Sequence, residues 1–236
     1  MNQSRFTRII EGIVFTSLLL SLLYAGLRLF VVSRQNHLPG DRPESDYVVI
    51  ILQCLLGIFM MFLPGLLRQK FSIQIPNSMY LAFVLFLYCA IYLGEVRNFY
   101  NLFRYWDTIL HTFSGGMLGA LAFSFIALLN NSERVPMNLS PLFVALFSFC
   151  FSVTLGVLWE FYEFLADGLF GLNMQKFILP DGTLLVGHAA LTDTILDLFV
   201  DALGALGTAI LGYISLKHNK GWIDRLLVRS IALSKE

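Results

Sequence analysis

Ionisable side chains recur at helical intervals inside three otherwise apolar stretches of this chain. They form three sets: Asp107 and His111, then Glu160 and Glu163, then Asp193, Asp197 and Asp201. Spacings of three or four residues put the members of each set on one face of a helix. A charge near the middle of a membrane helix costs roughly 2.5 to 3.5 kcal/mol, so we expect these groups to face one another or a bound ion.

The chemistry open to such a set follows from its charge. Six carboxylates in one volume cannot all ionise without compensation, because burial and neighbouring like charges both disfavour the charged form. The group must share protons, pair with cations or bind a metal. A histidine among carboxylates suits a divalent Zn, Mn or Fe ion, whereas an all-oxygen set suits Mg or Ca. His111 therefore favours a transition metal, although the HExxH spacing of zinc enzymes is absent.

One hypothesis is a metal-assisted enzyme. We expect a divalent ion to be held by His111, Glu160, Asp197 and Asp201. Glu163 or Asp107 would then act as a catalytic general base toward a lipid-linked or envelope substrate. No activated Ser or Cys accompanies the set, so this hypothesis depends on the metal.

Two other hypotheses remain open at this stage. The same carboxylates suit a proton or cation relay in a transporter or channel. They also suit a non-catalytic membrane factor, in which a buried polar network fixes helix register with Arg28, Arg97 or Arg104 as counter-charges. Unmatched halves and polar groups confined to one leaflet disfavour transport.

The elements that carry these residues must be membrane helices. The chain has 236 residues, of which 57% are hydrophobic and 14% charged, and its mean hydropathy is +0.71. This composition predicts an all-α, polytopic membrane bundle in a single domain. Apolar runs of about 20 residues, long enough to cross a core of about 30 Å, predict six spans near 12–32, 47–67, 79–95, 108–129, 141–166 and 194–216.

The chain divides into regions of different character. Residues 1–103 carry few intramembrane charges and are interpreted as scaffold helices, while 104–216 carry the polar site. The tail at 217–236 alternates Lys or Arg with Trp222, Leu226 and similar residues, which predicts an amphipathic helix on the cytoplasmic surface. The long 167–191 connection predicts either a small hairpin or re-entrant lid over the site, or an ordinary interfacial loop.

Charge placement and small residues refine this arrangement. If the N-terminus is cytoplasmic, most of the 16 Lys and Arg residues lie on that side, so both termini are expected inside and the site in the extracytoplasmic leaflet. The zero net charge argues against a nucleic-acid partner. Small residues predict close packing of the helices that carry the site: Ser114, Gly115, Gly116 and Gly119, and Gly204, Thr208 and Gly212.

The polar motifs resemble a known family. They read Trp106-Asp107-x-x-x-His111, Trp159-Glu160-x-x-Glu163 and Asp193-Thr194-x-x-Asp197-Leu198-x-x-Asp201-x-x-Gly204. Over about residues 104–212 this pattern is similar to the YjdF-like family of bacterial inner-membrane proteins and, more distantly, to the VanZ-like family associated with glycopeptide-antibiotic resistance. The resemblance implies a multi-pass protein of the bacterial cell membrane with these positions at its centre. It implies no particular activity.

Overall fold

The fold is a bundle of membrane-length helices. The computed structural model describes residues 5–32, 42–71, 73–130, 139–179, 181–218, 220–221 and 229–230. Within these residues, six helical segments are long and apolar enough to cross a membrane: Arg5–Val31, Glu44–Lys70, Asn77–Val96, Trp106–Ile126, Pro141–Phe170 and Ala189–Lys217. The predicted all-α bundle and its six spans are confirmed, and most spans extend beyond the predicted bounds at one end or both.

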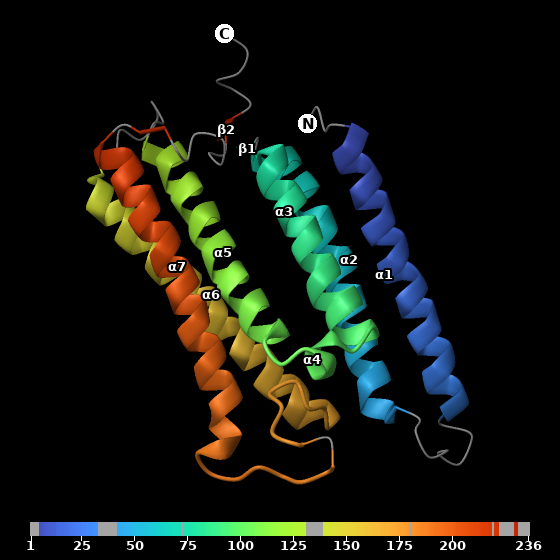
Figure 1. Ribbon diagram of the computed structural model, residues 1–236. Coiled ribbons are helices and arrows are strands. Elements are labelled where there is room, and N and C mark those ends of the chain that lie inside the picture. Colours follow the sequence, from blue (N-terminus) through green and yellow to red (C-terminus); the bar gives the residue numbers. More distant parts are fainter. Residues whose placement is uncertain are drawn as a thin grey trace.

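Seven α-helices make up most of the described chain (Figure 1). The helices are α1 (Arg5–Val32), α2 (Glu44–Phe71), α3 (Asn77–Leu87), α4 (Phe99–Leu102), α5 (Trp106–Asn130), α6 (Pro141–Phe170) and α7 (Thr192–Lys217). A π-helix, η1 (Tyr88–Val96), continues α3, and a 3-10 turn, η2 (Ala189–Leu191), leads into α7. Two short strands, β1 (Ile73–Gln74) and β2 (Arg229–Ser230), pair antiparallel.

The long helices form two groups (Figure 1): α1, α2 and α3 with η1 pack on one another, and so do α5, α6 and α7. Each group has its own core. Leu18, Ile50 and Val84 belong to the core of the group formed by α1, α2 and α3 with η1. The group of α5, α6 and α7 packs around a second core that includes Phe123 and Val144. A small third cluster of Val49, Ala166 and Leu172 joins α2 to the end of α6. The two groups therefore meet along a seam, and the polar motifs lie on one side of it.

The π-helix at the end of the third span is stabilised by groups from outside it. Arg42 donates hydrogen bonds to the Glu95 and Val96 carbonyl oxygens, both at 3.2 Å, which occupies acceptors that the helix end leaves free. The indole of Trp106 donates to the Cys89 carbonyl at 3.3 Å. π-Helical turns such as those of η1 are frequent at functional sites. Here the contacts anchor the start of α5 against the N-terminal group.

The end of α6 turns into a structured loop. Gly171 adopts a left-handed conformation with φ of 65° and closes the helix, because its N–H donates to the Asp167 carbonyl at 2.9 Å. Farther on, Ile178 and Leu184 form an antiparallel bridge, with a hydrogen bond from Leu185 N to Phe177 O at 2.8 Å. Of the two structures left open for this connection, the small hairpin is the one observed.

The closest helix contact joins α5 to α7. A side chain on Gly115 would collide with the Asp201 carbonyl oxygen, and one on Gly204 would collide with the Thr112 carbonyl oxygen. Thr208 also donates to the Gly116 carbonyl at 3.0 Å. Backbone meets backbone at this crossing, as the small residues predict.

The two ends of the described chain lie at one end of the bundle (Figure 1). The start of α1 and the end of α7 lie there, opposite the 171–191 loop. This arrangement agrees with termini on the same side of a membrane. The predicted amphipathic helix of the tail falls mainly on 222–228 and 231–236, which lie outside the described residues, and Arg229–Ser230 is part of β2.

The α5–α7 crossing generates a stability prediction. Gly204→Ala should destabilise the protein by about 1 to 3 kcal/mol, because the new methyl group forces the helices apart. Gly207→Ala on the same helix is the matched control, since its position has open space, and it should be neutral or stabilising by up to about 1 kcal/mol. Thermal unfolding of both variants in detergent measures the difference. Equal unfolding temperatures would contradict the close contact.

Candidate functional site

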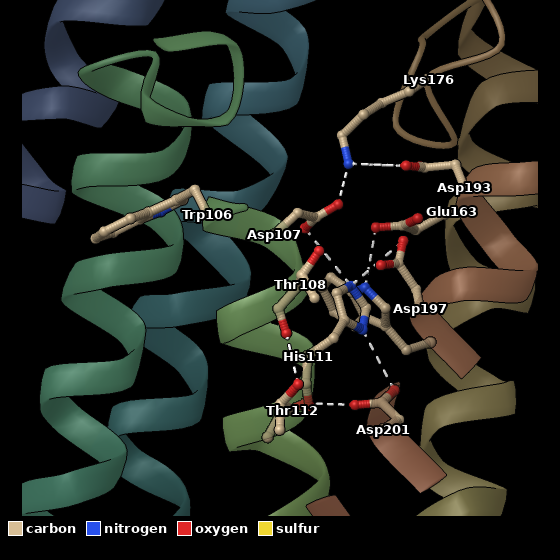
Figure 2. Close-up of polar contacts among 12 residues, drawn as sticks. Trp106, Asp107, Thr108, His111, Thr112, Glu163, Lys176, Asp193, Asp197 and Asp201 are labelled. Atoms are coloured by element: carbon tan, nitrogen blue, oxygen red, sulfur yellow. Dashed lines mark hydrogen bonds and ion pairs between the residues drawn. The ribbon is translucent and has the colours of Figure 1, made fainter. Parts of the chain in front are cut away.

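The polar cluster is centred on His111 (Figure 2). Its Nε2 atom lies 3.7 Å from Asp107 Oδ1 and 3.9 Å from Asp197 Oδ2, and its Nδ1 atom lies 3.3 Å from Asp201 Oδ2. His111 is 9% exposed, and Asp197 and Asp201 are 4% exposed. One imidazole from α5 thus contacts a carboxylate of its own helix and two of α7.

Asp201 occupies the opposite side of the ring from the other two carboxylates. Ser114 donates to its Oδ1 at 2.9 Å, and His111 Nδ1 donates to its Oδ2. Because a carboxylate only accepts hydrogen bonds, this contact puts an N–H on Nδ1, and in the neutral imidazole Nε2 then carries the lone pair. His111 Nε2 is therefore held toward Asp107 and Asp197. Gly156 of α6 is adjacent, and a side chain there would meet Asp201 Oδ2 at 2.7 Å.

Three of these residues can offer ligand atoms to one ion. Ligand atoms of Asp107, His111 and Asp197 lie within 4.8 Å of one another. Metal–ligand bonds of about 2.0 to 2.2 Å allow two ligands of one ion to be up to roughly 4 Å apart, so a small contraction would close the group. The arrangement differs from the expected ligand set in three ways: Asp107 joins it, Asp201 lies on the other ring nitrogen of His111, and Glu160 is not part of it.

The other two expected site residues lie on different surfaces of α6. Glu163 lines the same polar chamber as Asp107 and His111 and accepts a hydrogen bond from the Trp159 indole at 2.9 Å. Glu160 instead lines a groove between α6 and α7 that includes neither Asp107 nor His111. The structure thus brings five of the six expected residues around His111 and its chamber, and places Glu160 apart.

Lys176 supplies a positive charge to the cluster. It forms ion pairs with Asp107 and with Asp193, the latter at 3.1 Å. Burial alone would lower the pKa of Lys176, but the carboxylates of Asp107 and Asp193 outweigh it, so its pKa is raised. The ammonium is therefore charged throughout the neutral range. The sequence had suggested Arg28, Arg97 or Arg104 as counter-charges; the cation found beside these carboxylates is Lys176.

The loop holds Lys176 in place through its own hydrogen bonds. Both oxygens of Asp167 accept backbone N–H groups, from Met174 at 2.7 Å and Gln175 at 3.0 Å. Asn173 bonds to the backbone of Ile178 in both directions, each at 2.8 Å. Lys176 itself has φ of 49°, a left-handed conformation that such a tight turn requires. The sequence contains an indication that Lys176 belongs to the site, since it is the only Lys or Arg between Arg134 and Lys217.

The cluster forms the wall of two adjoining cavities. A polar chamber of about 150 Å³ lies under the loop and is lined by Glu95, Asn98, Lys176 and others. A mainly apolar cavity of about 310 Å³ lies deeper in the seam, between residues such as Phe83 and Leu155. Five residues line both: Gln53, Tyr100, Asp107, His111 and Trp159. The N-terminal group therefore contributes to the site through Gln53, Glu95 and Tyr100, which the sequence analysis did not single out.

The raised pKa of Lys176 generates a labelling prediction. At pH 9, Lys176 should react with an amine-acylating reagent more slowly than the exposed Lys217, because its nitrogen stays protonated. Asp107→Asn should raise the rate at Lys176 and leave Lys217 unchanged. Peptide mass spectrometry of timed samples measures both rates. Equal labelling of the two lysines in the wild type would show that the ion pairs do not hold.

Comparison with known proteins places the chain in a family. A family described as "Predicted membrane protein (DUF2238)" matches residues 6–218. An "Uncharacterized protein" of Thermotoga maritima is 31% identical over 162 residues, which is 67% of this chain and 76% of that protein. No solved structure matches. The family match covers the first helix to the end of the last span and includes all the residues around His111, so the chain belongs to the DUF2238 family of predicted membrane proteins.

Proposed function

We propose that this protein is a metal-dependent membrane enzyme that acts on an amphiphilic substrate. The observation that carries the proposal is the grouping of Asp107, His111 and Asp197, whose ligand atoms lie within 4.8 Å of one another. With Nδ1 donating to Asp201, the Nε2 lone pair of His111 faces two carboxylates. With a neutral imidazole, the Nε2 lone pair and the two carboxylates form a donor set that suits Zn, Mn or Fe.

Each neighbouring residue has a role in this proposal. A bound ion would supply Lewis-acid chemistry at the chamber wall. Asp201 and Ser114 orient His111, as partners of a ligating imidazole commonly do. Glu163, on the same chamber, acts as the general base, and the Trp159 indole holds one of its oxygens. Lys176 holds the carboxylates of Asp107 and Asp193 in place beside the chamber.

The two adjoining cavities support a lipid-linked or other envelope substrate. The chamber offers charged groups to a polar head, and the deeper cavity offers apolar walls to a chain. Both share His111 and Asp107, so the junction of head and chain would lie against the metal group. In the bacterial cell membrane, with both termini cytoplasmic, this end of the bundle would lie in the outer leaflet.

Metal content tests the first step of the proposal. Purified wild-type protein should hold about one Zn, Mn or Fe ion per chain, measured by inductively coupled plasma mass spectrometry. His111→Ala and Asp197→Asn should lose that ion, because each removes a ligand. Glu160→Gln is the matched control and should keep it, since Glu160 lies in the other groove. A folded wild type that holds no ion after metal is supplied would contradict the proposal.

Turnover tests the second step. Wild-type protein loaded with its metal should consume a component of a bacterial lipid extract, detected by liquid chromatography and mass spectrometry. Glu163→Gln should keep the metal and lose at least about 99% of the activity, since general-base catalysis contributes about 10² to 10⁴. Glu11→Gln on α1 is a matched control, because that carboxylate is bonded to Tyr80 far from the chamber. Consumption by Glu163→Gln at the wild-type rate would remove Glu163 from the mechanism.

One observation favours a second function, a proton or cation relay. Contacts run without a break from Asp193 through Lys176, Asp107 and His111 to Asp201, which lines the deeper cavity. Such a chain of ionisable groups suits stepwise proton transfer within a membrane. A relay needs no stoichiometric metal, so the metal measurement separates the two functions.

A further inference from the structure

A second groove, distinct from the His111 cluster, lies between α6 and α7 and is bounded by the loop that joins them. It encloses about 550 Å³, and its walls are mainly apolar, with Phe161, Phe164, Leu191 and Leu198 among them. Phe161, Phe164 and Leu191 are 58%, 65% and 58% exposed. In a membrane-spanning bundle, exposed apolar side chains face lipid. The groove therefore opens sideways, toward the bilayer.

An unsatisfied carboxylate lies in this groove. Glu160 is 3% exposed, and neither of its oxygens makes a hydrogen bond of normal geometry to a described residue. Thr194 and Gln175 lie beside it and are hydrogen-bonded to each other at 2.8 Å, but both are neutral, and no described Lys or Arg forms an ion pair with Glu160. A buried polar group without a partner costs about 1 to 3 kcal/mol, and more if it is charged. A ligand that donates hydrogen bonds to Glu160 would remove this cost.

We propose that the groove binds a phospholipid with a primary-amine head group, with the ammonium on Glu160 and an acyl chain along Phe161, Phe164 and Leu198. An ionised carboxylate only accepts hydrogen bonds, and an ammonium only donates them, so the two are complementary in charge and in hydrogen bonding. A quaternary ammonium head group carries no N–H and cannot replace it. The apolar walls then contact the part of the lipid that belongs in the hydrocarbon core.

The depth of Glu160 agrees with such a ligand. Glu160 precedes Phe170, the last residue of α6, by about 15 Å at 1.5 Å per residue. The 30-residue α6 is about 45 Å long, which exceeds a hydrocarbon core of about 30 Å. If α6 is centred in the hydrocarbon core of the bilayer, Glu160 lies about two helical turns or less below the surface of that core. A head group at this boundary reaches the groove from the side.

Native mass spectrometry of the full-length protein tests the proposal with two lipids that share the same acyl chains. Phosphatidylethanolamine should bind the wild type about tenfold more tightly than phosphatidylcholine, the difference expected for one charge-assisted hydrogen bond. Glu160→Gln should abolish this preference. Glu11→Gln, the same change on α1, should keep it. Equal affinities in the wild type, or a preference that survives in Glu160→Gln, would overturn the proposal.

A second variant keeps the test decisive if Glu160→Gln does not fold. Gly168 lines the groove, and a side chain built there meets nothing within 4 Å, so Gly168→Leu should fill the groove without distorting the helix. It should weaken phosphatidylethanolamine binding to the level of phosphatidylcholine and leave the unfolding temperature unchanged. Unaltered preference in this variant would place the lipid elsewhere. Metal content should be normal in both groove variants, so this inference and the proposed enzyme can fail separately.

Discussion

The contact between the backbones of α5 and α7 is the constraint on which the polar site depends. Gly115 and Gly204 let the two helices meet without side chains between them, and the carbonyl oxygens of Asp201 and Thr112 fill that space. This approach places the His111 ring of one helix directly against Asp197 and Asp201 of the other. A wider crossing would leave each carboxylate to face the bilayer interior alone, which costs several kcal/mol per charge. The close packing of α5 against α7 is therefore what allows His111 to compensate the charges of Asp197 and Asp201.

The negative charge of the carboxylates is also compensated from outside the helices. Lys176 is carried by a loop, yet its ammonium pairs with Asp107 at the start of α5 and Asp193 at the start of α7. The loop can hold that position because Asp167 and Asn173 satisfy its backbone groups. Two ion pairs thereby connect the loop to the first turns of α5 and α7. The positive charge paired with Asp107 and Asp193 is therefore supplied by the loop between α6 and α7.

Composition and periodicity predicted the fold well, because the length of a membrane span and the i, i+4 spacing are local properties. They also predicted that the helices carrying Asp107, Glu163 and Asp197 converge. They could not determine the rotation of α6 about its own axis, which decides that Glu163 lines the chamber while Glu160, one turn earlier, lines the outer groove. Lys176 was missed because the path of a long loop depends on side-chain to backbone hydrogen bonds that have no fixed spacing.

The division of the bundle into two groups with separate cores has a mechanical consequence. Each core is closely packed and resists compression, whereas the seam between them contains the deeper cavity of about 310 Å³. A seam that contains a cavity has fewer atom contacts across it than a packed core, so the two groups are joined more weakly than the helices within each group. A force that spreads the helices apart, such as lateral tension in the bilayer, should therefore open the seam before it disturbs either core.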